Sequence, residues 1–287
     1  MTASYEDRML RVLDYIHDNP RGDLSLDALA DVAAMSRFHW HRVFHGMTGE
    51  TAAQAVRRIR LHRAACWLVQ TEESVAEIAT QAGYDTPQSF SRAFRDGFGM
   101  TPTRFRFRGD LTAPLLKPDK GSRPMFPVQI ETLPAMRLAV LPHTGAYMEV
   151  SRVFEQVSTL ATSRNLWPHA TGMLGLYYDD PNAVPAAELR SHAGLSLGPD
   201  AEIASPLEEI SLPSRSYGVL TFKGPYAGLR AAYDHLYGTW LPSSGREPAH
   251  QPALEIYLNA PQDTAPDNLL TKVCVPLKAE TRAKEPA

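Results

Sequence analysis

Two stretches that begin fifty residues apart share one local pattern: Ser36-Arg37-Phe38-His39-Trp40-His41-Arg42-Val43-Phe44 and Thr86-Pro87-Gln88-Ser89-Phe90-Ser91-Arg92-Ala93-Phe94. In each copy the apolar residues recur at helical spacing and predict a helix with one buried face. Ser36 and Thr86 are suitable N-caps, and Pro87 fits the first turn of a helix. The opposite face is mostly polar. It carries Phe38, His41, Arg42 and His45 in the first copy, and Gln88, Ser91, Arg92 and Arg95 in the second.

A further helix is expected upstream of each copy, over residues 26–33 and 75–82. Alanines in these segments are small enough to let two helices cross closely, and short turns at Ala34-Met35 and Gly83-Tyr84-Asp85 separate the paired helices. This is a helix-turn-helix pattern that occurs twice. Further helices are expected over 5–19, over 51–69 between the two motifs, and after Thr101-Pro102.

Basic charge is concentrated in the same part of the chain. Residues 36–63 contain six arginines and one acid, Glu50, and residues 92–108 contain five arginines and one acid, Asp96. The whole chain nevertheless carries a net charge of −3. Arginine alone would be explained by a solvated surface, but its coincidence with two helix-turn-helix motifs favours double-stranded DNA as a partner.

Residues 5–108 resemble the DNA-binding domain of the AraC/XylS family of transcription regulators. The signature lies in the second half: Ala79, Gly83-Tyr84, Phe90, Arg92, Phe94, Gly99, Thr101-Pro102 and Phe105-Arg106. The resemblance implies that both polar helix faces enter major grooves. Arg42 and Gln88 are the preferred candidates for contacts to bases, with phosphate contact or solvent exposure as the alternatives. The full set of expected DNA-contacting residues is Arg37, Phe38, His39, His41, Arg42, Arg58, Thr86, Gln88, Ser89, Arg92 and Arg95.

A metal site is the other interpretation of the histidines near the first helix. His41 and His45 lie one helical turn apart, a spacing that zinc ligands use. No Cys, Asp or Glu stands near them in the sequence, so hydrogen bonds to DNA are favoured. We expect no metal and no cofactor.

The pattern changes after residue 108. We expect a DNA-binding domain over 1–108, a linker over 109–124 that contains three prolines, an α+β domain over 125–278, and a tail over 279–287. The α+β part repeats itself after about 80 residues, because Gly145-Ala146-Tyr147 matches Gly224-Pro225-Tyr226 and residues 174–181 match 254–261. A duplicated strand-helix-strand-strand unit predicts two antiparallel sheets with a groove between them.

Residues 125–278 resemble the GyrI-like effector-binding domain, which is also found in multidrug-sensing regulators. Glu255 is the strongest functional candidate of this half, because it interrupts an apolar strand while the equivalent residue of the first repeat, Gly175, is not acidic. The resemblance implies a ligand pocket at this strand. The alternative is an outward-facing Glu on a half-exposed strand. An acid in an aromatic groove would attract a cationic, apolar ligand. The residues expected to form the walls of this groove are Tyr147, Trp167, Tyr177, Tyr226 and Tyr257. The alternative for each of them is a place in the hydrophobic core.

The sequence therefore predicts a multidomain regulator that binds DNA and senses a small molecule. It has no apolar run long enough to span a membrane, no signal peptide, and only Cys66 and Cys274, one in each expected domain, which favours the cytoplasm. Two alternatives remain. In the first, Glu255 and a Tyr activate water for the hydrolysis of a small reactive compound. In the second, the C-terminal domain binds a protein such as RNA polymerase. No nucleophile triad supports catalysis, so no catalytic residue is assigned.

Overall fold

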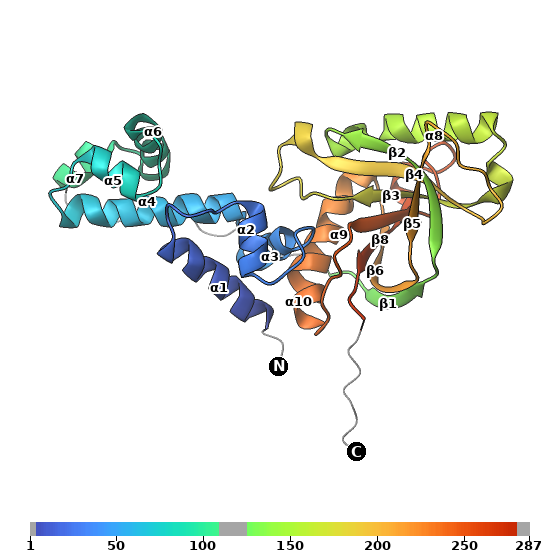
Figure 1. The fold of residues 1–287 in the computed structure, drawn as a ribbon, viewed down its shortest axis with the longest axis horizontal. Coiled ribbons are helices and arrows are strands. Elements are labelled where there is room, and N and C mark those ends of the chain that lie inside the picture. The colour runs from blue at the N-terminus through green and yellow to red at the C-terminus, as the bar shows by residue number, and fades with distance from the viewer. Residues whose placement is uncertain (1–3, 109–124, 280–287) are drawn as a thin grey trace, which may run out of the picture. The chain divides into compact units, whose positions relative to one another are not determined.

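The computed structural model describes residues 4–108 and 125–279, which form two compact units (Figure 1). The first unit contains the described residues up to Arg37 and from Thr48 to Arg108. The second contains Phe38–Met47 together with the C-terminal part of the chain. The linker expected over 109–124 and all but the first residue of the expected tail lie outside the described residues. No helix in the described ranges is long and apolar enough to cross a membrane.

The first unit is entirely helical, as predicted. Serine or threonine caps begin most of its helices: Ser4, Ser25, Thr51, Ser74 and Thr86 each accept a hydrogen bond from a backbone N–H in the first turn. The helices are α1 (Tyr5–Asp18), α2 (Leu26–Val32), α4 (Ala52–Gln70), α5 (Val75–Gln81), α6 (Pro87–Phe98) and α7 (Pro102–Arg108).

The turns that follow α2 and α5 have the same conformation. Ala34 and Gly83 both adopt a left-handed backbone, with φ of 51° and 78°. In both turns the next residue donates its N–H back into the helix, Met35 to Ala30 at 3.1 Å and Tyr84 to Ala79 at 3.0 Å. A Cβ on Gly83 would come within 2.2 Å of the Pro20 carbonyl oxygen, whereas Ala34 carries its methyl group on an exposed surface. The two motifs are therefore duplicated in backbone geometry as well as in sequence.

The second helix-turn-helix motif has its own core. Phe90 and Phe94 of α6 are fully buried and pack with Phe105 of α7 and with residues of α4 and α5. Gly99 ends α6 in a left-handed conformation. Because the apolar side of α6 is committed to this core, its opposite side is exposed.

The helix of the first motif, α3 (Trp40–Thr48), differs from the prediction in two ways. It begins four residues after Ser36, because residues 37–39 form a turn. Its residues up to Met47 group with the second unit. The late start has a physical cause within that unit: the Phe38 ring lies 4.9 Å from the His250 ring, and the His39 ring lies 5.5 Å from the Tyr237 ring.

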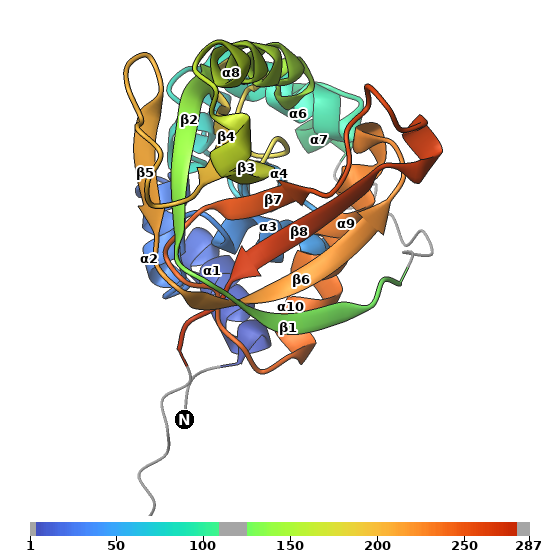
Figure 2. The ribbon, with the colours of Figure 1, turned by 90° about the vertical axis from the view of Figure 1, so that its right-hand side faces the viewer.

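The second unit contains one antiparallel sheet of eight strands in the order β1-β6-β8-β7-β3-β4-β2-β5 (Figure 2). The expected pair of separate sheets is therefore wrong, although the duplicated unit is confirmed. The strands β3 and β7, which occupy equivalent places in the two repeats, pair with each other and join the halves. The strands are β1 (Val128–Leu133), β2 (Met136–Thr144), β3 (Ala170–Tyr177), β4 (Arg190–Leu197), β5 (Glu208–Leu212), β6 (Arg215–Lys223), β7 (Ala253–Tyr257) and β8 (Leu270–Pro276).

Each repeat adds a helix after its first strand. In the first repeat α8 (Ser151–Ser163) packs through Val153, Val157 and Ala161 on the strands β2 and β4. In the second, α9 (Leu229–His235) continues through a π-helical turn (Leu236–Trp240) into α10 (Leu241–Ser243). The 3-10 turns Tyr147–Glu149 and Tyr226–Gly228 precede α8 and α9 at equivalent places. Leu174, Leu176 and Leu254 point to the other side of the sheet and enter a separate apolar core.

Candidate functional site

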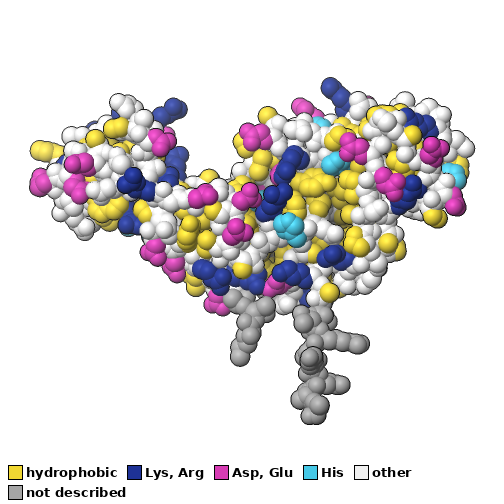
Figure 3. Space-filling view, viewed as in Figure 1, with side chains coloured by type: hydrophobic (Ala, Val, Ile, Leu, Met, Phe, Trp, Pro, Cys, Tyr) yellow, Lys and Arg dark blue, Asp and Glu magenta, His cyan; other side chains and the backbone are white. Residues whose placement is uncertain are grey.

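A cavity of about 590 Å³ lies in the second unit, lined by α8, α9 and the strands β3 and β7. On the face shown in Figure 3, hydrophobic side chains gather in a hollow of this unit. Of the residues expected to bind a ligand, Glu255, Tyr147, Tyr177, Tyr226 and Tyr257 all line the cavity. The volume is in the range of small-molecule sites.

The prediction for Trp167 is wrong. Its side chain is 42% exposed and its indole N–H donates to Thr162 Oγ1 at 2.9 Å. Trp167 follows the C-terminal end of α8, whereas the cavity is lined by the first two turns of that helix. The distance along α8 therefore removes Trp167 from the site.

Glu255 is buried, with 4% of its surface exposed, and two tyrosines hold its carboxylate. Tyr233 donates to Oε1 at 2.9 Å and Tyr257 donates to Oε2 at 2.7 Å. Tyr177 lies 2.7 Å from the Tyr257 hydroxyl. Since Tyr257 uses its only proton toward Glu255, Tyr177 is the donor in that second bond. Burial raises the pKa of Glu255, and the tyrosine hydrogen bonds oppose the rise only in part.

The position of Glu255 follows from the strand register. Glu255 pairs directly with Gly175 across β7 and β3, so both residues face the cavity side of the sheet. A Cβ on Gly175 would lie 2.8 Å from the Tyr177 ring. Glycine at this position thus leaves room for Tyr177 to turn back over its own strand toward Tyr257.

The aromatic residues that line the cavity occur at equivalent positions in the two repeats. Tyr147 packs edge-to-face on Tyr177 with ring centres 4.9 Å apart, and Tyr226 packs in the same way on Tyr257 at 5.5 Å. Members of these pairs match across the duplication at a separation of about 80 residues. The carboxylate breaks the symmetry, because it has no acidic counterpart at Gly175.

Sequence reasoning missed two walls that the same repeat would have found. Phe154 and Tyr233 line the cavity from α8 and α9 and occupy equivalent places in the two repeats. Phe154 packs edge-to-face on Tyr257 at 5.1 Å, and Tyr233 stacks parallel to Tyr237 at 6.2 Å. The signal was an aromatic residue seven positions after each Gly-x-Tyr tyrosine.

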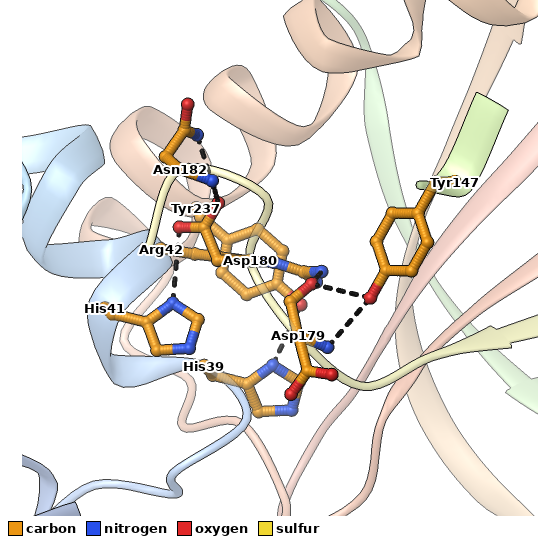
Figure 4. Close-up of polar contacts among 8 residues, drawn as sticks. All are labelled: His39, His41, Arg42, Tyr147, Asp179, Asp180, Asn182 and Tyr237. Atoms are coloured by element: carbon orange, nitrogen blue, oxygen red, sulfur yellow. Dashed lines mark hydrogen bonds and ion pairs between the residues drawn. The ribbon is translucent and has the colours of Figure 1, made fainter. Parts of the chain in front are cut away.

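Arg42 of α3 also lines the cavity, which the sequence did not indicate. Its side chain is 7% exposed. The guanidinium lies 4.7 Å from the ring centre of Tyr233 and 5.4 Å from that of Tyr237. One of its nitrogens donates to the Asp179 carbonyl oxygen at 2.6 Å, and Tyr147 donates to the same oxygen at 3.0 Å (Figure 4).

The histidines before and after the start of α3 are buried in the same surroundings (Figure 4). His41 Nδ1 lies 3.2 Å from Asp180 Oδ2, and His39 Nδ1 lies 2.9 Å from the Tyr237 hydroxyl. Burial alone would raise the pKa of Asp180, but the His41 hydrogen bond and the Arg42 charge hold it well below its usual range. Burial and the nearby Arg42 charge lower the pKa of His39 to about 3, so its ring is neutral. Among the described residues no three His, Cys, Asp or Glu side chains are grouped as metal ligands.

The remaining residues expected to contact DNA are placed differently in the two motifs. On α6 the side chains of Gln88, Ser89, Arg92 and Arg95 are exposed, and Thr86 is both exposed and the N-cap. Arg37 is exposed as well. Arg58 forms a bidentate pair with Glu50, with Nε at 3.0 Å from Oε2, so a phosphate would have to compete with that carboxylate.

Comparison with known proteins gives two matches that together cover most of the chain. Residues 126–278, more than half of it, match the family described as GyrI-like small molecule binding domain. Residues 29–108 match a helix-turn-helix domain family.

Three curated relatives illustrate how far the likeness extends. The Right origin-binding protein of Escherichia coli K12 is 26% identical over 273 residues, which cover 89% of this chain and 92% of that protein. The transcriptional regulator Rob of Salmonella typhimurium is 32% identical over 47% of this chain and 46% of its own length. The bifunctional transcriptional activator and DNA repair enzyme AdaA of Bacillus subtilis is 34% identical over 33% of this chain. The match spans 45% of AdaA, so less than half of either Rob or AdaA is covered.

Proposed function

The chain belongs to the family of proteins with a GyrI-like small molecule binding domain, here joined to an AraC-type helix-turn-helix region, and from this premise we propose that it regulates transcription in response to an organic cation. The helix-turn-helix region binds operator DNA, and the cavity around Glu255 binds the cation. In this proposal the protein works in the cytoplasm, where the DNA lies, and RNA polymerase is a further partner.

The observation that carries the effector class is the environment of Glu255. The carboxylate is buried in a cavity of about 590 Å³ and is held by the hydroxyls of two tyrosines. Within the described ranges no basic side chain forms a hydrogen bond with it. A buried carboxylate without a paired cation is costly, and a cationic ligand supplies the missing charge. The faces of the surrounding tyrosines attract the same ligands.

The exposed side of α6 supports the DNA-binding part of the proposal. Gln88 and Arg92 lie on that side one helical turn apart, and both side chains can form bidentate pairs with base edges. Phe90 and Phe94 fix the helix from its other side, so the polar side chains have a rigid base. We propose that α6 enters a major groove.

The proposal is tested with tetraphenylphosphonium as a cationic probe and triphenylphosphine oxide as a neutral control of similar ring content. Calorimetry on the full chain is expected to show binding of the cation and at least tenfold weaker binding of the neutral compound. Equal affinity for both compounds, or no binding of the cation, would refute the assignment of the effector class.

The DNA-binding part is tested on a duplex selected from a random pool by the wild-type protein in the presence of the cation. The Gln88→Ala and Arg92→Ala variants are expected to lose affinity for the selected duplex, by about tenfold each, and to lose little on random duplexes. Equal losses on both duplexes would exclude these side chains as base readers.

A further inference from the structure

The face of α3 that was expected to contact DNA is covered by the C-terminal domain. Phe38, His41 and Arg42 contact C-terminal residues, and His45 lines the cavity beside them. The Phe38 ring lies 4.9 Å from that of His250, and His41 lies 3.2 Å from Asp180. Arg42 and His45 both line the cavity. His41 and Arg42 are buried in these contacts and cannot reach a base edge at the same time, while Phe38 and His45 are half-buried.

The backbone of α3 also contacts the C-terminal domain closely. A Cβ on Gly46 would lie 2.3 Å from Gly238 Cα and 2.7 Å from Gly238 N. Gly238 belongs to the π-helical turn that follows α9. The contact is therefore made between two backbones, and any side chain at position 46 would push α3 away from the turn.

Arg42 is itself a cation bound to the aromatic wall of the cavity. Its guanidinium lies over Tyr233 at 4.7 Å and Tyr237 at 5.4 Å, and Tyr233 is also a donor to Glu255. An organic cation that used the faces of the same rings would occupy the space of the Arg42 side chain. Its positive charge would also repel the guanidinium across the low-dielectric cavity.

We propose that the C-terminal domain holds the DNA-reading face of α3 in the absence of effector, and that an organic cation in the cavity displaces Arg42 and frees this face for DNA. The inference rests on the proposed function, because the displacing ligand is the cation assigned to Glu255. Cation and DNA then favour the same state of α3, so each raises the affinity for the other by the same factor.

Gly46→Ala tests the inference, because alanine blocks the backbone contact without removing any expected DNA contact. Alanine also favours the helical state over glycine, so α3 itself is not weakened. Without cation, the variant is expected to bind the selected duplex at least tenfold more tightly than the wild type. Addition of tetraphenylphosphonium should tighten DNA binding by the wild type and leave the variant unchanged.

Gly97→Ala in α6 is the matched control. It makes the same substitution in the helix of the second motif, where the new methyl group would meet only the end of the Leu61 side chain at 3.0 Å. Its DNA affinity and its response to the cation should equal those of the wild type. Asp180→Asn approaches the same contact from the C-terminal side, since it removes the charge that faces His41 and Arg42, and it should also raise DNA affinity without cation.

A separate measurement follows the cation instead of the DNA. Arg42→Met removes the internal competitor and keeps an unbranched apolar side chain, so the full chain without DNA should bind tetraphenylphosphonium several-fold more tightly. Unchanged or lower DNA affinity in both Gly46→Ala and Asp180→Asn would overturn the inference. So would an unchanged cation affinity in Arg42→Met.

Failure of the proposed function would look different. If the wild type bound no tetraphenylphosphonium in calorimetry, the effector assignment and displacement by a cation would both fall before any DNA was added. If the cation bound and Glu255→Gln weakened its binding, but Gly46→Ala and Asp180→Asn both left DNA affinity unchanged, the effector site would stand and only the coupling through α3 would be refuted.

Discussion

Replacement of Glu255 by Gln removes one charge from the cavity and changes little else. The amide oxygen still accepts a hydrogen bond from Tyr233 or Tyr257, whose hydroxyls lie 2.9 and 2.7 Å from the present carboxylate oxygens. At an effective dielectric constant of about 20, a cation about 5 Å away gains roughly 3 kcal/mol from the carboxylate. Arg42 stands over Tyr233 and reduces this gain, so we expect a loss of about 2 kcal/mol, or about 30-fold in Kd.

Glu155→Gln is the control for this measurement. Glu155 also lines the cavity, but its side chain is exposed, so solvent screens its charge. Exposed ion pairs contribute about 0.2–1 kcal/mol, which corresponds to less than about fivefold in Kd. Calorimetry with tetraphenylphosphonium on the two variants and the wild type compares a buried and an exposed carboxylate at one cavity.

The pH dependence gives an independent check on the same residue. Because burial raises the pKa of Glu255, its carboxyl becomes protonated at a higher pH than an exposed Glu. The protonated carboxyl lacks the charge just as glutamine does, so affinity of the wild type should fall below that pKa by about 30-fold in total, to the level of Glu255→Gln. Glu255→Gln should show no such fall. An affinity that is equal in wild type and Glu255→Gln at pH 7, or a variant that loses thermal stability, would refute a ligand-binding role for this carboxylate.

Three further predictions concern stability and DNA binding. Gly83→Ala should cost at least 2 kcal/mol of unfolding free energy, because φ is 78° and the new Cβ would meet the Pro20 carbonyl oxygen. Gly99→Ala, at φ 70° with open space around it, should cost about 1 kcal/mol. Chemical denaturation compares the two variants, and equal costs would contradict the steric argument. The pKa of His39 is lowered to about 3, so its contribution to the unfolding free energy is complete above pH 6.5 and is lost toward pH 3. Between pH 7.5 and 5.5 the wild type should lose about 1.4 kcal/mol more unfolding free energy than His39→Gln. Parallel pH profiles of the two proteins would exclude a buried neutral imidazole at position 39. The affinity of the full chain for DNA should fall steeply with salt, and Arg92→Ala should lower the affinity with little change in that slope, because Arg92 is proposed to contact a base; a clearly flatter slope would show a phosphate contact instead.

The helical unit could be predicted almost to the residue because its signals are local. Caps such as Thr51 and Thr86 mark where helices begin, and glycine in a left-handed conformation marks where α6 ends. The start of α3 could not be predicted in this way. Phe38 and His39, which precede the helix, contact His250 and Tyr237 some 200 positions away, and such contacts override the preference of Ser36 for a cap.

The site was predictable where the internal repeat pointed to it. Glu255 stood out because its partner is Gly175, and the register places these two residues opposite each other in one sheet. The pairing of β3 with β7 could not be read from the repeat, because a duplicated unit is compatible both with two sheets and with one. Trp167 was expected as a wall for its aromatic ring alone, and it has no counterpart in the second repeat.

The duplication explains the matched aromatic walls of the cavity, but it explains neither a preference for a cation nor a coupling to DNA. Two copies of one unit give matched walls, such as Tyr147 on Tyr177 and Tyr226 on Tyr257, and a symmetric cage has no preferred occupant. In the proposed function, two asymmetric features supply the cation preference and the coupling to DNA. Glu255 gives the cage a charge, and Arg42 enters it from a segment outside the repeats. A ligand changes an equilibrium only through its different affinity for two states. In our proposal Arg42 provides that difference, because it is part of the cavity in one state and of the DNA-reading face in the other.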